Sequence, residues 1–458
     1  MNRKDKSVLS RRGMMLGGTA LACTGTPALE AAARKRKPDN GKFVRVEGGR
    51  FVLRGETYRY AGTNMWYGAY LGAPGGNRDR LRRELDALAG LGITNLRILG
   101  SSETSPLKNA IRPAFRDATA SYNEDLLLGL DYLLAEMGKR DLKAVIYLNN
   151  FWEWTGGMMT YLFWTNGGRY FDMNDPAHPW PAWADYCAKF YRAAKANALY
   201  RNYIKAVVER RNRYTGVAYR DDPAVMSWQL ANEPRPGGSL AQTQFAAFYG
   251  WVAETAAFLR KLDANHLVST GNEGLKGCLE REECVVKLNA IPGVDYLTFH
   301  IWPLNWSWIR PDDLAAGYDA CEANTRDYIA AHLRIAAEAG KPAVAEEFGF
   351  PRDGGGYGLA VPTTYRDRFY RLVFGAVEDS ARAGGPFAGT NFWAWGGEGR
   401  AQHPDFAMQP GDTSYVGDPP QEPQGRNSVF DSDTATLDII RNHAAALARL
   451  TRPSGRAP

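Results

Sequence analysis

The chain has 458 residues, of which 23% are charged and 45% hydrophobic, a balance that fits a globular protein with a substantial core and argues against disorder. The formal net charge is +6, but residues 1–37 alone carry nine Lys or Arg against two acidic residues. The remainder is therefore close to neutral, which excludes the basic surface expected of a nucleic-acid-binding protein.

The N-terminal segment has the composition of an export signal. Arg11 and Arg12 precede a short run of apolar and small residues, and an alanine-rich stretch follows up to Ala33. This order predicts a signal of the twin-arginine type, with a basic disordered tail as the alternative, and places the mature protein in the periplasm or outside the cell. Lipid attachment at Cys23 is not expected, because the residue three positions before it is alanine rather than leucine. No later stretch reaches the roughly 18 apolar residues that a membrane-spanning helix needs.

Short β-rich runs alternate with amphipathic segments after this signal. We expect strands near 58–64, 95–99, 143–149, 225–231, 267–270, 296–299, 343–345 and 390–395. We expect helices near 78–91, 124–138, 183–212, 241–263, 320–339, 365–384 and 434–450.

This alternation predicts an α/β protein, a (β/α)8 TIM barrel with long loops after its strands. The strands are largely continuous apolar runs, which is typical of a parallel sheet buried on both faces. A doubly wound open sheet is the alternative, but no Gly-x-Gly-x-x-Gly follows the first strand. The expected organisation is an export signal at 1–33, a basic disordered segment at 34–42, the barrel at 43–452 and a tail at 453–458.

Polar residues collect where the predicted strands end. In a barrel these ends share one face, which is where enzymes of this fold place their sites. A single such residue could cap its strand, but capping does not explain a series. The residues are Asn64, Arg97, Asn149, Asn150, Asn232, Glu233, Glu273, His300, Glu346, Glu347, Trp393 and Trp395.

Two glutamates in this series suggest a reaction. Glu233 lies in Asn-Glu-Pro after the fourth strand, and Glu347 lies in Glu-Glu-Phe-Gly after the seventh. Glycosidic cleavage needs one carboxyl group as acid and another as nucleophile or base, and a separation of about 5–5.5 Å gives retention of configuration. A lone glutamate is usually a surface charge. A pair at the ends of two strands can instead face each other across a cleft.

With these motifs the sequence resembles glycoside hydrolase family 5, and within it the endo-β-1,4-mannanases, over about residues 43–450. The resemblance implies that Glu233 is the acid/base, that Glu347 is the nucleophile and that Asn232 binds the sugar hydroxyl beside the cleaved bond. Arg97 matches the arginine that pairs with the nucleophile, and such a cation favours an ionised carboxylate. The negative Glu347 is expected in turn to raise the pKa of Glu233, because like charge disfavours ionisation.

Two further predictions concern residues near the nucleophile. His300 matches the family histidine after the sixth strand, but Trp302 stands where the family often has tyrosine, which leaves one hydrogen bond to the nucleophile open. Trp302 could instead form a stacking wall. Glu346 directly precedes the nucleophile and is expected to support it or to face away, as alternate strand residues do.

The preference for mannan depends on two further features of the resemblance. Arg235 follows Glu233-Pro234, as in mannanases where this arginine helps to hold the leaving-side sugar; an ordinary surface ion pair is the alternative. Segment 149–157, which includes Asn150 and Trp152, is similar to the mannanase loop after the third strand.

Tryptophan is frequent, with 13 residues, and its flat apolar ring suits sugars as well as protein cores. By resemblance, Trp393 is the platform under the sugar that precedes the cleaved bond, and Trp395 shares its face and is expected to reach the cleft. The expected substrate-binding residues are therefore Arg97, Asn150, Trp152, Asn232, Arg235, His300, Trp302, Trp393 and Trp395. About half of the loop tryptophans are expected to stack on sugars: Trp152, Trp154, Trp164, Trp302, Trp306 and Trp308. Trp228 and Trp251 are expected to pack in the barrel.

No cofactor and no metal are expected, since no two of the six histidines have metal-ligand spacing. Cys278 and Cys284 are a candidate disulfide in an exported protein, with two free thiols as the alternative. The expected partner is a β-mannan polysaccharide or oligosaccharide, bound by a monomer. A family 5 β-glucanase, an exo-acting β-mannosidase and a non-catalytic carbohydrate-binding barrel are the alternatives.

Overall fold

The computed structural model describes residues 41–119 and 121–451, so the predicted export signal, Cys23 and the C-terminal tail lie outside the described residues. Within those ranges, no helix is both long enough and apolar enough to span a bilayer.

Eight parallel strands form one sheet in the order β8-β7-β6-β5-β4-β11-β10-β9. They are β4 (Tyr60–Asn64), β5 (Asn95–Leu99), β6 (Lys143–Tyr147), β7 (Val225–Gln229), β8 (Leu267–Ser269), β9 (Leu297–Ile301), β10 (Ala343–Phe348) and β11 (Phe387–Phe392). Two backbone hydrogen bonds join the outer strands, from Asp295 N to Val268 O (2.8 Å) and from His300 N to Glu273 O (3.2 Å). The sheet is therefore a nearly closed barrel, and the predicted fold is confirmed.

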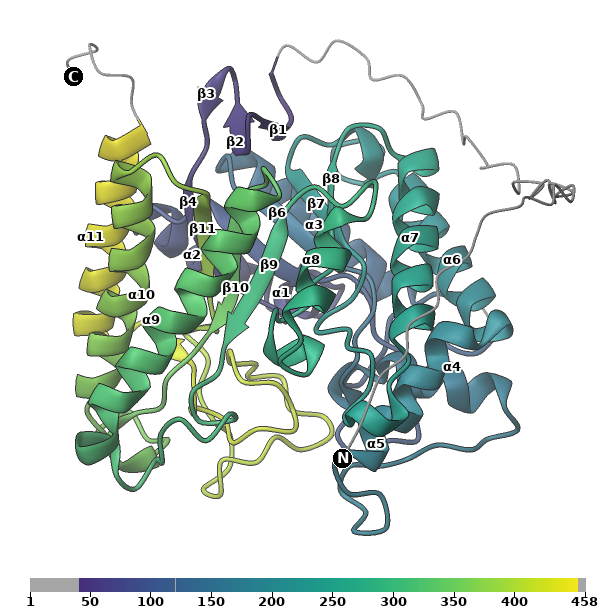
Figure 1. Ribbon diagram of the computed structural model, residues 1–458. Coiled ribbons are helices and arrows are strands. Elements are labelled where there is room, and N and C mark those ends of the chain that lie inside the picture. The colour runs from purple at the N-terminus through teal and green to yellow at the C-terminus, as the bar shows by residue number, and fades with distance from the viewer. Residues whose placement is uncertain (1–40, 120, 452–458) are drawn as a thin grey trace, which may run out of the picture. The chain divides into compact units, whose positions relative to one another are not determined.

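Helices surround this barrel (Figure 1). They are α1 (Gly68–Gly72), α2 (Arg78–Gly90), α3 (Glu124–Lys139), α4 (Gly157–Thr165), α5 (Ala182–Cys187), α6 (Ala194–Glu209), α7 (Phe245–Leu262), α8 (Glu282–Ala290), α9 (Leu314–Glu338), α10 (Thr364–Arg382) and α11 (Thr434–Thr451). The helical segments predicted over 183–212 are α5 and α6, which a 3-10 turn at Ala188–Arg192 separates. The short helices α1, α4 and α8 were not predicted.

The last barrel strand ends earlier than the sequence indicates. Its pairing with β4, from Gly389 opposite Tyr60 to Phe392 opposite Thr63, ends the strand at Phe392. Trp393 follows the strand, and Trp395 begins a separate strand, β12 (Trp395–Gly397), which pairs with β13 (Val429–Phe430). The apolar run continues past the end of β11, so hydrophobicity alone could not place the boundary.

A small antiparallel sheet lies at the N-terminal end of the barrel (Figure 1). Its strands, β1 (Arg45–Glu47), β2 (Arg50–Leu53) and β3 (Glu56–Thr57), were not predicted. Phe51 is fully buried and packs edge-on against Tyr296, with ring centroids 5.2 Å apart. This contact closes one end of the barrel. The long segments 166–181 and 398–428 lie at the opposite end, where the strands finish (Figure 1).

Candidate active site

Arg97, on β5, is the centre of the polar cluster at the C-terminal end of the barrel. The side chain is fully buried, and its guanidinium donates to residues from four other parts of the barrel. The acceptors are Asn64 Oδ1 (3.0 Å), Gln229 Oε1 (2.8 Å), Asn232 Oδ1 (2.6 Å) and Glu347 Oε1 (2.5 Å). The predicted pairing of Arg97 with Glu347 is therefore present, and the same cation orients Asn232. Charge-assisted bonds of this kind hold a buried ion firmly in place.

The backbone turns sharply at Glu233, just after β7. Its φ is 48°, a left-handed value that is uncommon for a residue with a Cβ atom. The amide of Glu233 donates to Gly271 O at 2.9 Å, which fixes the turn. Such strain concentrates at functional sites, where the surrounding structure enforces it. Here the turn places the Glu233 carboxylate in the cleft, as predicted.

A bulge in β10 presents two successive glutamates to the barrel. The register with β9 shifts between Ala345 and Glu347, so Glu346 has no partner in the ladder. Glu346 is fully buried and accepts hydrogen bonds from Gln229 Nε2 (2.5 Å) and Tyr296 Oη (3.2 Å). Glu346 was expected either to support the nucleophile or to face away from it. In the structure it is part of the hydrogen-bonded cluster around Arg97 and does not face away.

His300 connects the two glutamates. Its Nδ1 atom lies 2.6 Å from Glu233 Oε1 and 3.3 Å from Glu347 Oε2. The two facing oxygens of the predicted pair therefore meet at one imidazole nitrogen, which places both carboxylates at the same point of the barrel rim. A close pair of this kind is the arrangement expected of a retaining glycosidase.

Two indole groups complete the hydrogen bonding of the pair. Trp302 Nε1 donates to Glu347 Oε2 at 3.2 Å. The tryptophan therefore makes the hydrogen bond to the nucleophile that was in doubt because the family often has tyrosine at this position. Trp152 Nε1 donates to Glu233 Oε2. Each glutamate is thus oriented by one indole and by His300.

The charges of the cluster decide where its proton resides. Burial raises the pKa of Glu233, but the hydrogen bond and charge of His300, together with Arg235, lower it to about 2. Burial lowers the pKa of His300, but Glu347 and Glu233 raise it to about 10. The prediction that the pKa of Glu233 is raised is therefore wrong for this state, because the hydrogen bond and charge of His300 outweigh burial. The shared proton is held on His300, facing Glu233.

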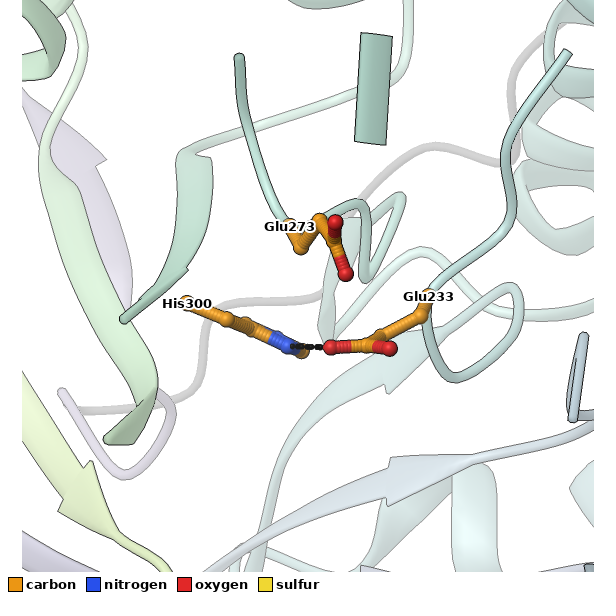
Figure 2. A group of neighbouring side chains, drawn as sticks. All are labelled: Glu233, Glu273 and His300. Carbon is orange, nitrogen blue, oxygen red and sulfur yellow. Dashed lines mark hydrogen bonds and ion pairs between the residues drawn. The ribbon is translucent and has the colours of Figure 1, made fainter. Parts of the chain in front are cut away.

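Glu273 stands above this pair on the segment after β8 (Figure 2). It forms a buried ion pair with Arg235, so Arg235 is not the exposed ion pair considered as its alternative. Burial raises the pKa of Glu273 to about 8, although Arg235 opposes the rise. Glu233, Glu273 and His300 each offer one atom within 4.8 Å of the others, a spacing that could hold a metal ion. In this structure Glu233 is bound to His300, and Glu273 is paired with Arg235.

A cleft of about 650 Å³ opens over these groups. Most predicted contact residues line it: Trp152, Asn232, Glu233, Arg235, Trp302, Glu347 and Trp393. Further lining residues were not predicted as contacts: Asn109, Glu153, Met173, Asn174, Trp180, Lys276, Asn305, Pro419, Gln421 and Glu422. Apart from Glu153, which lies in segment 149–157, they are on segments without a motif. Glu273, one of the strand-end residues, also lines the cleft.

Four predicted substrate-binding residues do not line the cleft. Asn150 is fully buried, and its Oδ1 accepts from Asn232 Nδ2 at 3.1 Å, so it positions Asn232 instead. Trp395 is buried in β12, where the chain has already left the barrel rim. His300 and Arg97 lie beneath the glutamates rather than on the cleft wall.

The candidate disulfide is absent. Cys278 and Cys284 are buried free thiols, and Cys278 Sγ contacts Asn272 Oδ1 at 3.7 Å. Burial raises the pKa of the Cys278 thiol, which disfavours the thiolate that oxidation requires.

A barrel with two hydrogen-bonded carboxylates at the ends of β7 and β10 is the arrangement of a glycoside hydrolase. The sequence matches the family model described as "GH family 5 beta-mannosidase-like" over residues 41–452. The chain therefore belongs to glycoside hydrolase family 5.

Individual relatives agree. The chain is 31% identical over 422 residues to a putative mannan endo-1,4-β-mannosidase 9 of Oryza sativa subsp. japonica, covering 90% of this chain and 91% of the relative. A family 5 mannosidase of Rhizomucor miehei, solved with mannosyl-fructose, is 34% identical with a TM-score of 0.83, covering 90% of this chain and 99% of that one. The endo-1,4-β-mannanase of the same organism is 25% identical with a TM-score of 0.65, covering 89% and 99%.

Proposed function

We propose that the protein is a retaining endo-β-1,4-mannanase that hydrolyses mannan, glucomannan or galactomannan. The observation that carries this proposal is the meeting of Glu233 and Glu347 on one imidazole nitrogen. The names of the similar proteins support mannan as the substrate class.

The geometry supports a double displacement. Glu347, held by Arg97 and Trp302, attacks the anomeric carbon while Glu233 protonates the departing glycosidic oxygen. The C–O bond to the leaving sugar breaks and a glycosyl ester to Glu347 forms. Water then attacks the anomeric carbon and Glu233 takes the water proton. The bond between that carbon and the Glu347 oxygen breaks, and Glu347 is released as a carboxylate.

The proton for the first step starts on His300. The 2.6 Å contact from His300 Nδ1 to Glu233 Oε1 lets the proton pass to the carboxylate as substrate displaces water from the cleft. Neutral His300 and protonated Glu233 are then the reactive pair.

The first test is removal of each carboxylate. Glu347→Ala is expected to lower kcat on galactomannan by on the order of 10⁴-fold, because no covalent intermediate forms. Glu233→Ala is expected to be similarly inactive on galactomannan, but on an aryl β-mannoside whose leaving group needs no proton, azide should restore turnover and give a β-mannosyl azide product. Full activity of Glu347→Ala would refute the nucleophile assignment, and an α-configured azide product would refute retention.

The second candidate function is an exo-acting β-mannosidase, favoured by the higher structural similarity to the Rhizomucor mannosidase than to the endo-mannanase. Viscosity separates the two. An endo-acting enzyme lowers the viscosity of galactomannan long before mannose accumulates, whereas an exo-acting enzyme releases mannose first. Activity confined to carboxymethylcellulose would indicate a β-glucanase instead.

The proposed location is the periplasm or the medium, supported by the arginine pair and apolar run at the N-terminus. Replacing Arg11 and Arg12 by lysine should retain the protein inside the cell. Fractionation with a cytoplasmic marker measures this, and unchanged export would contradict the twin-arginine route.

A further inference from the structure

A second hollow lies on the outer side of the barrel, away from the cleft. Its volume is about 500 Å³, and it runs along α3 and the turn that follows α6. Its lining includes Tyr132, Lys139, Tyr214 and Asp222, and none of its lining residues also lines the cleft. Lys139 shortly precedes β6 and Asp222 shortly precedes β7, so the hollow extends toward the end of the barrel opposite the catalytic rim.

Tyr214 presents an exposed aromatic ring to this hollow. It is 45% exposed, and among the described residues the only other Phe, Tyr or Trp exposed to a similar degree is Trp180, which lines the cleft. A tyrosine in such a place offers a ligand an apolar face and a polar edge. The two most exposed aromatic rings of the described chain are therefore found in its two largest hollows.

The aromatic side chains of this hollow are held in place without a ligand. Tyr132 packs edge-on against Tyr214, with ring centroids 5.2 Å apart. The guanidinium of Arg78 lies 4.4 Å from the ring of Tyr132 and 5.3 Å from that of Tyr214, and it donates to Tyr214 Oη at 2.6 Å. Buried Asn212 fixes the turn, because its Oδ1 accepts from the amide of Tyr214 at 2.8 Å. A ring that is already fixed loses little conformational entropy when a ligand binds.

The charged groups of the hollow have both signs. Glu136 accepts from the exposed ammonium of Lys139 at 2.5 Å and from Arg140 Nη1 at 2.8 Å. The carboxylate of Asp222 accepts from the amide of Ala224 at 2.9 Å. Neither sign prevails, so the hollow favours neither a polyanion nor a polycation. Aromatic rings beside donors and acceptors suit a neutral ligand that is rich in hydroxyl groups.

We propose that this hollow is a secondary binding site for a neutral polysaccharide chain, with Tyr214 as its stacking ring. The inference rests on the proposed mannanase function, which supplies a polymer that extends beyond the cleft. Because the two hollows share no lining residue, the segment of chain bound at Tyr214 is not the segment that is cleaved. Binding at the second site keeps the enzyme on the polymer and raises the effective concentration of chain near the cleft.

Affinity electrophoresis in gels that contain galactomannan tests this site, with Glu347→Ala as the background so that the polymer is not cleaved. Adding Tyr214→Ala should weaken the apparent affinity about two- to tenfold, the effect of one lost aromatic stacking contact. Adding Tyr214→Phe instead, which keeps the ring, should retain most of the affinity. In the otherwise native enzyme, Tyr214→Ala should lower the rate on insoluble mannan and leave kcat/KM for mannohexaose unchanged, because the cleft alone handles the short substrate.

Tyr249, on α7, provides a matched control. It is partly exposed and also has a cation against its ring, with Lys287 at 5.7 Å, but it lines neither hollow. Tyr249→Ala should leave the affinity for galactomannan unchanged.

Three results would overturn the inference. The first is equal retardation by galactomannan with and without Tyr214→Ala, and the second is a loss of kcat/KM on mannohexaose that matches the loss on insoluble mannan. The third is a self-association of the native protein that Tyr214→Ala abolishes, which would assign the hollow to a second copy of the chain. Failure of the native enzyme to hydrolyse both galactomannan and mannohexaose would instead overturn the proposed function.

Discussion

Trp302 illustrates how one residue can replace another without loss of its hydrogen bond. An indole N–H and a phenol O–H are both donors, and in this chain the indole reaches Glu347 Oε2 at 3.2 Å. The larger ring also packs edge-on against Trp393, with centroids 6.1 Å apart, so it forms part of the wall that the sequence suggested as its other role.

Removing only the donor of Trp302 should expose its contribution. Trp302→Phe keeps an aromatic ring but leaves Glu347 with one fewer hydrogen bond, and a bond to a charged group contributes about 1.5–3 kcal/mol. We expect kcat/KM to fall about 10- to 100-fold, with the rate of formation of the glycosyl-enzyme affected most. Trp393→Phe is the control for loss of ring area alone, and an equal effect of the two variants on that rate would contradict the donor role.

His300 should set the alkaline limb of the pH–activity profile. Its pKa is raised to about 10, so the cluster keeps its shared proton across the neutral range and loses it only as pH rises toward that value. In His300→Asn the proton must be held by Glu233 without the imidazole, and the alkaline limb should move to lower pH. The measurement is kcat/KM between pH 4 and 10; an unchanged alkaline limb in a folded, weakly active variant would contradict this account.

The sequence identified the residues whose positions the strands determine. Four site residues could be predicted because they lie at strand ends, which strand order alone brings to one rim: Glu233, Glu347, Arg97 and Asn232. Trp180 could not be predicted as a cleft residue, because it lies on a segment with no regular structure. No periodicity in such a segment indicates which side chain meets the cleft.

At the level of elements, the segment between β12 and β13 shows how a long loop is kept in one conformation. Asp418 is fully buried, and its carboxylate accepts from the backbone amides of Gly425 (2.8 Å), Asn427 (2.7 Å) and Ser428 (3.2 Å). These bonds fold the loop back on itself and present Glu422 to the cleft. Burial and Asp418 raise the pKa of Glu422 to about 7.

Asp418→Ala should therefore reduce activity more than it reduces stability. Three amides lose their acceptor, and each unsatisfied buried group costs about 1–3 kcal/mol unless the loop opens to water. Opening is the cheaper outcome, so we expect a small change in Tm, a lower kcat/KM and faster proteolysis within 398–428. Asp405→Ala, which removes one exposed acceptor in the same loop, is the control. Unaltered proteolysis of Asp418→Ala would refute the role.

The elements that the sequence missed are short or irregular. Strands β1 to β3 have two to four residues each, too few for an alternating pattern, and helix α1 has only five residues. The barrel strands were found within a few residues, since continuous burial makes each a distinct apolar run. The end of β11 was misplaced because Trp393, Ala394 and Trp395 extend that run.

In the whole molecule, the two ends of the barrel differ in structure and role. The N-terminal end is closed by Phe51 and Tyr296, and the C-terminal end carries buried charges that a stable core would otherwise exclude. Eight repeated units made the barrel predictable, whereas its charged interior could be inferred only from individual strand-end residues.

One of those charges should make the stability of the whole protein depend on pH. Glu103 is buried, and burial raises its pKa to about 7, although Ser101 and the amide of Gly157 bind the carboxylate. Because the folded pKa exceeds the unfolded value near 4.5, Glu103 favours folding below pH 4.5, and this contribution is lost as pH rises through 7. The loss amounts to about 3 kcal/mol at pH 8.

In Glu103→Gln the side chain at this position does not titrate. The variant should therefore not lose this part of its unfolding free energy as pH rises. Relative to the native protein, its unfolding free energy should increase between pH 5 and pH 8, by up to about 3 kcal/mol, with a parallel change in Tm. Urea unfolding at the two pH values measures the difference. Glu56→Gln, on the exposed turn of β3, should follow the native protein at both. A constant difference between Glu103→Gln and the native protein would mean that Glu103 is ionised at both pH values, and that the charge beneath the catalytic face is compensated in the folded state.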